Sequence, residues 1–181
     1  EQYLFNNYLN KNIYVRPDTY APNLDVTFDG IHILNKDIVS PKPSILIKLK
    51  DESRYLALND TALFKVQLRY PDGKLRSIRI DSDTLQFSPS NNVPGGDNNS
   101  ATLVYKPFLK EDGEYELVVT GKDVSSNQSG AIEYRVAFEV YNKSMITNLL
   151  NYPNPFTTST AFVFTLTGTE LPSQFRIQIL T

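Results

Sequence analysis

The chain has 181 residues, 40% of them hydrophobic, and a formal net charge of −2. Such a chain can form a packed core, but it offers no basic surface for nucleic acid, and no apolar run approaches the roughly 20 residues of a membrane-spanning helix. The absence of Cys excludes thiol catalysis, disulfides and thiolate metal sites.

The first 23 residues are rich in Asn and end in "RPDTYAPN", a stretch with two prolines. Proline interrupts regular structure, and "NIYVRP" just before it has the composition of a strand. We therefore interpret residues 1–23 as a linker or an edge strand that arrives from an upstream domain.

From Leu24 onwards apolar and polar residues alternate, which is typical of strands with one buried face. "SILIKLKD" places Ile45, Ile47 and Leu49 on one face, and "ALFKVQLRYPDGKLRSIRI" predicts a hairpin that turns at Pro-Asp-Gly. Further strands are expected in "LDVTFDG", "IHIL", "TLQF", "ATLVYKP", "EDGEYELVVTGKD" and "IEYRVAFEVYN". About eight short strands without a long helix predict an all-β fold, an immunoglobulin-like antiparallel β-sandwich, over residues 24–142.

A second unit is expected after this sandwich. We interpret residues 143–181 as a linker and the truncated start of a C-terminal domain. Phe162, Phe164 and Leu166 alternate with polar or smaller residues, and a second alternating run covers residues 175–179. Because two strands alone are barely stable, they must lean on the first domain or on a partner, or be completed by further strands.

Two motifs carry a resemblance to known proteins. "EDGEYELVVTGKDVSSNQSG" is similar to the penultimate strand and turn of bacterial immunoglobulin-like modules, with Ser126 where Gly is usual and matches at Asp112, Gly113, Tyr115, Asp123 and Asn127. "NYPNPFTTSTAFVFTLT" resembles the first strand of C-terminal sorting and hook-capping-type Ig-like domains of Bacteroidetes proteins exported by type IX secretion, gingipain-type cysteine peptidases among them. Its motif consists of Asn151, Tyr152, Pro153, Asn154, Pro155 and Phe156.

The resemblance implies a non-enzymatic structural module of a large exported protein, at the outer-membrane surface or outside the cell. Such a module spaces and supports a C-terminal sorting domain. Its expected partners are neighbouring domains of the same protein, the type IX secretion machinery or surface glycans. The alternatives are a glycan- or protein-binding module, and an accessory domain of a gingipain-type peptidase whose catalytic domain lies upstream. We interpret the Pro-rich motif either as a rigid connection through which the chain enters the second domain, or as a signal that a receptor recognises.

No cofactor is expected, apart from a structural Ca²⁺ as the alternative to plain turn capping by acidic side chains. Acidic residues gather near predicted turns, namely Asp25, Asp29, Asp51, Glu52, Asp81, Asp83, Asp112 and Asp123. The pair Asp123 and Asn127 is the foremost Ca²⁺ candidate, because both lie in one predicted turn.

Other residue patterns carry weaker expectations. His32, the single His, is expected at the surface without a catalytic role, and "NNVPGGDNNS" as a flexible loop. Asp-Thr-apolar triplets resemble the O-glycosylation motif of Bacteroidetes exported proteins and make Thr61 and Thr84 candidate acceptors. The sequons at Asn59, Asn98, Asn127 and Asn142 are interpreted as accidental. Several tyrosines are expected to pack against neighbouring domains or, alternatively, to form a platform on which a sugar stacks. They are Tyr3, Tyr8, Tyr14, Tyr20 and Tyr55.

Overall fold

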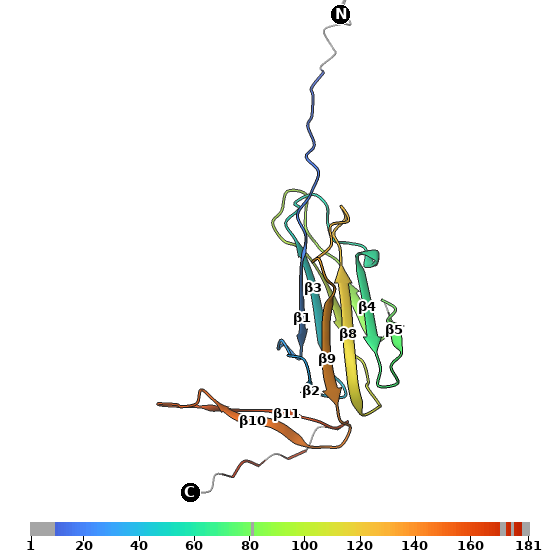
Figure 1. Ribbon diagram of the computed structural model, residues 1–181. Coiled ribbons are helices and arrows are strands. Elements are labelled where there is room, and N and C mark those ends of the chain that lie inside the picture. The colour runs from blue at the N-terminus through green and yellow to red at the C-terminus, as the bar shows by residue number, and fades with distance from the viewer. Residues whose placement is uncertain (1–9, 81, 171–172, 175, 179–181) are drawn as a thin grey trace, which may run out of the picture.

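The computed structural model describes residues 10–80, 82–170, 173–174 and 176–178. Residues 10–22, here called the leading segment, carry no strand and enter one end of a two-sheet sandwich. The chain leaves the opposite end of the sandwich and forms a separate two-stranded hairpin (Figure 1). Of the residues expected to form a linker or an edge strand, Asn23 opens the first strand of the sandwich, and residues 1–9 lie outside the described part.

Nine strands build the sandwich in two sheets. The first sheet has the order β1-β3-β7-β6, with β1 Asn23–Phe28, β3 Ile45–Asp51, β7 Asn99–Tyr105 and β6 Leu85–Ser88. The second has the order β2-β9-β8-β4-β5, with β2 Asp37–Val39, β9 Tyr134–Val140, β8 Gly113–Gly121, β4 Phe64–Arg69 and β5 Leu75–Ser77. A 3₁₀ turn, η2 (Thr61–Leu63), precedes β4. This order and pairing are those of an immunoglobulin-like β-sandwich, as predicted.

The core lies between the two sheets and is built from the inward positions of the alternating strands. In β3 the predicted face of Ile45, Ile47 and Leu49 is fully buried, and the residues between them are exposed. Phe28 and Phe138 meet edge to face across the core with ring centroids 5.2 Å apart. Each Å² of apolar surface that is buried stabilises the fold by about 25 cal/mol. The packing of the two sheets against each other is therefore the main stabilising term.

The connection that follows β1 differs from the sequence-based expectation. The Asp29-Gly30 turn forms, with positive φ at both residues, but "IHIL" contributes only an isolated bridge between Ile31 and Phe28. The chain instead crosses to the other sheet, where β2 pairs in parallel with β9. Three residues are enough for this pairing, too few for an alternating pattern to be visible in the sequence.

The hairpin also differs from expectation. Its strands are β10 (Ile146–Tyr152) and β11 (Ala161–Leu166), so β10 occupies a region that was expected to be a linker. The expected strand over residues 175–179 is not formed at residues 176–178, while Phe175 and Ile179 lie outside the described part. The Pro-rich motif ends β10 and opens the connection to β11, and Phe156 lies exposed in that connection rather than at the start of a strand.

Candidate functional site

Three carboxylates converge where the leading segment meets the sandwich. Asp18 comes from the leading segment, Asp51 is the last residue of β3, and Asp123 follows β8 by two residues. One carboxylate oxygen from each residue lies within 4.8 Å of the other two. We call this group the carboxylate cluster.

Strand alternation places Asp51 inside the protein. Asp51 continues the inward series of β3 after Leu49, so that the position carries a charge where an apolar residue is usual. Its relative exposure is 3%. One carboxylate oxygen, Oδ1, accepts a 2.9 Å hydrogen bond from the backbone N–H of Glu52.

A tight turn after β8 holds Asp123, whose exposure is 1%. Its Oδ1 accepts from the backbone N–H of Asn127 at 2.7 Å, and its Oδ2 accepts from Asn127 Nδ2 at 2.7 Å. Ser126 adopts a φ of 73° in this turn, in the left-handed region that favours Gly. The turn thus fixes both oxygens of one carboxylate in place.

Asn127 links this turn to the leading segment. Its Nδ2 also donates to the backbone carbonyl oxygen of Asp18 at 3.2 Å. Asp18 in turn accepts at Oδ1 from the backbone N–H of Tyr20 at 3.1 Å. Through its amide nitrogen, Asn127 thus contacts both Asp123 and the leading segment and holds them together.

The two sheets approach closely beneath the cluster because Gly121 has no side chain. A Cβ at Gly121 would lie 2.7 Å from Leu49 Cδ1. Leu49 and Gly121 each precede a cluster residue by two positions, on opposite sheets. This close approach therefore lets Asp51 and Asp123 meet across the end of the sandwich.

Asn99 supports the cluster from the neighbouring strand. It lies opposite Asp51 in the β3–β7 register and is 1% exposed. Its side chain accepts from the Leu58 N–H at 3.0 Å and donates to the carbonyl oxygens of Ser53 and Leu56. These bonds fix the loop that continues from Asp51.

The electrostatics of the cluster are uncompensated. No cluster residue takes part in the ion pairs formed among the described residues. Asp18 Oδ2 and Asp51 Oδ2 are both buried and accept no hydrogen bond within that part of the chain. Burial, and then the nearby charge of Asp18, raises the pKa of Asp51 above its ordinary value.

The sequence-based choice of Asp123 and Asn127 falls on this site. The structure brings Asp123 together with Asp51, which was noted as one of many turn acids, and with Asp18, which was not noted at all. Asp18 stands alone between two prolines in the sequence. Of the other noted acids, Asp81 lies outside the described residues.

The remaining candidate residues are dispersed. Thr84 is exposed next to β6, whereas Thr61 is half-buried in η2. His32 lies at the surface, as expected, and its Nε2 is 2.7 Å from Asp25 Oδ1. Tyr14, Tyr20 and Tyr55 are exposed but make no ring contacts with one another, and Tyr3 and Tyr8 lie outside the described residues.

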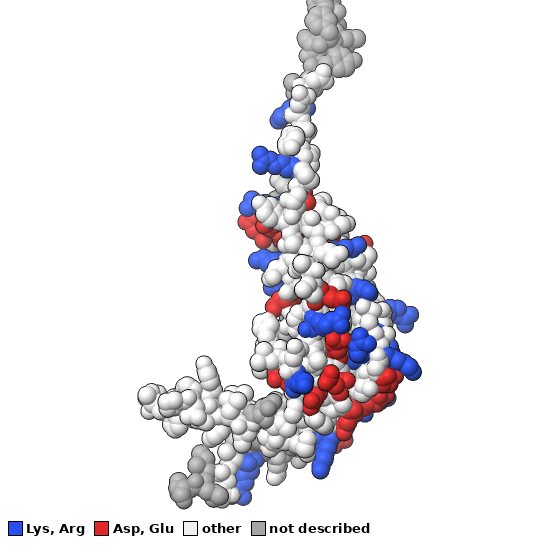
Figure 2. All heavy atoms as spheres, viewed as in Figure 1, with Lys and Arg blue, Asp and Glu red and all other residues white. Residues whose placement is uncertain are grey.

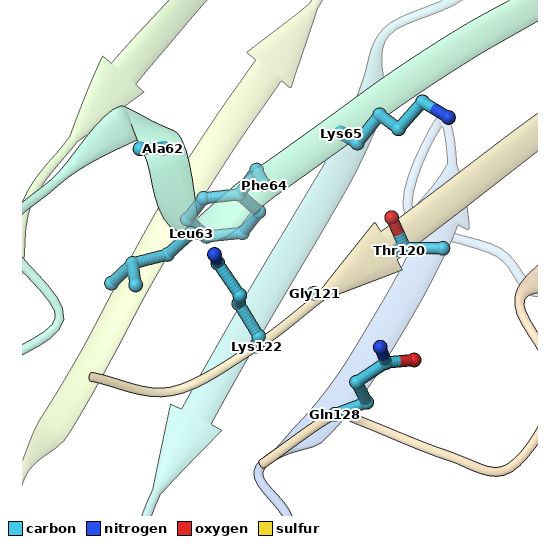
Figure 3. A pocket seen from close by; sticks show the side chains of 8 residues that line it. All are labelled: Ala62, Leu63, Phe64, Lys65, Thr120, Gly121, Lys122 and Gln128. Carbon is cyan, nitrogen blue, oxygen red and sulfur yellow. The ribbon is translucent and has the colours of Figure 1, made fainter. Parts of the chain in front are cut away.

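A hollow of about 310 Å³ lies beside the cluster, between the start of β4 and the end of β8 (Figure 3). Lys122 points toward Leu63 and Phe64, while Lys65 extends away from them. The lining contains no carboxylate and no His. Its titratable side chains are Lys65 and Lys122.

The fold and the cluster define the class of the protein, an immunoglobulin-like β-sandwich with a buried carboxylate cluster at one end. Within the described residues, no helix has the length and apolar character that crossing a bilayer would require. Comparison with models of known protein families finds no match, and neither does comparison with curated proteins.

Proposed function

We propose that the chain is a non-enzymatic structural module of a large exported bacterial cell-surface protein. In this proposal the sandwich spaces the upstream part of the protein from a C-terminal sorting-type domain, to which the β10–β11 hairpin belongs. The motif resemblance of Asn151–Phe156 suggests the type IX secretion system as the export route.

One observation carries this proposal. The leading segment enters at one end of the sandwich, and the hairpin departs from the opposite end (Figure 1). A module with its connections at opposite ends separates its neighbours by its full length, which is what a spacer requires.

The surface of the hairpin supports its assignment to a larger β unit. Residues 144–169 contain no charged side chain, and the hairpin stands out as an almost uncharged projection in Figure 2. Its exposed apolar side chains include Leu149, Leu150, Phe162 and Val163. Because two strands cannot bury such residues on their own, further strands or a neighbouring domain are needed to cover them.

The same surface favours a second candidate, a protein-binding module. The cover would then come from a different protein instead of the same chain. An accessory role beside a peptidase domain is compatible with either candidate, since the catalytic groups would lie on that other domain.

The test is the size and location of the native protein in its source cells. An antibody raised against this chain is used on fractionated cells and culture medium. A band far above 20.5 kDa in the outer-membrane or secreted fraction is expected. A band near 20.5 kDa in the cytoplasm would contradict the proposal.

A further inference from the structure

We propose that Asp18, Asp51 and Asp123 bind a calcium ion that fixes the leading segment to the end of the sandwich. The inference rests on the geometry of the cluster and does not depend on the proposed function.

The charge of the carboxylate cluster favours a bound cation. Three acidic side chains meet in a buried place without a basic partner among the described residues. Turn capping explains Asp18 Oδ1, Asp51 Oδ1 and both oxygens of Asp123, because each accepts a hydrogen bond. It does not explain Asp18 Oδ2 and Asp51 Oδ2, which are buried and unpartnered. Such oxygens carry a desolvation cost that a bound cation offsets.

The donor atoms of the cluster indicate which ion it binds. The donor set is all oxygen, since the chain lacks Cys and its one His pairs with Asp25 elsewhere. Oxygen ligands select hard cations. At Ca²⁺–O distances of about 2.4 Å, ligands on opposite sides of the ion lie up to about 4.8 Å apart. The oxygens of the cluster fall within that spacing. Ca²⁺ also accepts a site made of protein ligands more readily than Mg²⁺, which gives up its waters reluctantly and usually keeps several of them.

A bound ion would attach the leading segment to the sandwich through Asp18. Asp51 and Asp123 belong to the sandwich, but Asp18 lies four residues before the last residue of the leading segment, which ends at residue 22. An ion that Asp18 shares with the two buried residues ties the segment to both sheets. Asn127 already contacts the Asp18 carbonyl, so the ion adds to an existing contact. Calcium would therefore set the direction in which the chain enters the sandwich.

The experiment measures thermal unfolding of the full chain in EDTA, in CaCl₂ and in MgCl₂. We expect about 10 mM CaCl₂ to raise Tm by about 5 °C or more, and MgCl₂ to raise it less, for an affinity typical of extracellular calcium sites. Asp51→Asn should abolish the calcium response. In EDTA it should unfold at the same temperature as the wild type or a higher one, because it removes like-charge repulsion.

Asp18→Asn provides a second variant that cannot be dismissed as misfolded, because Asp18 lies outside the strands. It should weaken calcium binding at least about tenfold. In EDTA its Tm should equal or exceed that of the wild type, because it removes the same like-charge repulsion. Asp97→Asn is the matched control, since it removes an exposed carboxylate that pairs with Arg54. Its calcium response should equal that of the wild type.

Amide hydrogen exchange of residues 16–22 measures directly whether the ion fixes the leading segment. Calcium should slow this exchange in the wild type and leave it unchanged in Asp51→Asn, although the substitution lies in the sandwich. The proposal is overturned if calcium does not shift the wild-type Tm, or if both cluster variants keep the full shift. An equal shift with MgCl₂ would overturn the assignment to calcium, and unchanged exchange in the wild type would overturn the coupling to the segment.

Discussion

The hydroxyl of Tyr115 donates a 2.9 Å hydrogen bond to the backbone carbonyl oxygen of Glu111, four residues upstream. Tyr115 lies near the start of β8 and is almost fully buried, with its ring stacked on Phe138. This is the tyrosine corner of immunoglobulin-like folds, and it gives a physical reason for the Asp-Gly-x-Tyr motif. The corner fixes the connection that carries the chain from one sheet to the other.

Tyr115→Phe tests the corner, because it keeps the ring and removes the hydroxyl. We expect a loss of about 1–2 kcal/mol in the free energy of unfolding, since the Glu111 carbonyl loses its partner. Urea denaturation measures this loss, and the m-value should stay unchanged. Tyr55→Phe, at an exposed Tyr, is the control and should change stability by less than about 0.5 kcal/mol. Equal stability of the two variants would show that the corner bond contributes nothing.

We expect the free energy of unfolding to depend on pH through the ionisation of Glu116. Burial raises the pKa of Glu116, but hydrogen bonds from Arg69 and Arg135 outweigh burial and leave the pKa below its ordinary value of 4.5. A lowered carboxyl pKa stabilises the folded state at neutral pH, and this contribution is lost as pH falls below about 4.5 and then through the folded-state value. Glu116→Gln should therefore cost about 1 kcal/mol at pH 7 and progressively less at lower pH.

Urea denaturation of both proteins over this pH range provides the measurement. A difference that stays constant with pH would contradict the role of the ionised carboxylate. Glu114→Gln, on the same strand, is a control outside the ion pairs of the described residues and should show no such trend.

Gly121→Ala tests the close approach of the two sheets. The added methyl meets Leu49, a fully buried residue, so overpacking should cost about 1–3 kcal/mol. Leu49→Val makes room for the methyl, and the double variant should recover part of the loss, which a double-mutant cycle measures. Strictly additive effects would contradict the proposed contact.

Exposure predicts which threonine is modified if the protein is exported and O-glycosylated. Thr84 is exposed and Thr61 is half-buried, so we expect modification at Thr84 first. Peptide mass spectrometry of protein isolated from the source cells, compared with Thr84→Ala, measures this. Modification confined to Thr61 would contradict the prediction.

Much of the sandwich could be predicted because alternation of apolar residues is a local signal. The face of Ile45, Ile47 and Leu49 and the hairpin turn at Pro71-Asp72-Gly73 were both confirmed. The parallel pairing of β2 with β9 could not be predicted, because three residues show no period and their partners lie about a hundred positions later. Likewise, β10 lacks clear alternation, and its register with β11 contains an irregularity.

The carboxylate cluster could be predicted only in part. Asp123 and Asn127 share a turn, so their contact is local and the sequence indicated it. Asp51 was visible as an acid in the inward phase of a strand, which is the one signal that marks it as unusual. Asp18 joins through a contact between segments far apart in the sequence, and no local pattern reports such a contact.

The parallel pairing of β2 with β9 has a mechanical consequence. Tension applied between the leading segment and the hairpin would first pull β1 away from β3. It would then draw β2 and β9 past each other along their length, because both strands run in the same direction. The hydrogen bonds between β2 and β9 would bear this load together instead of opening one after another, so that a strand of three residues forms a second barrier to stretching.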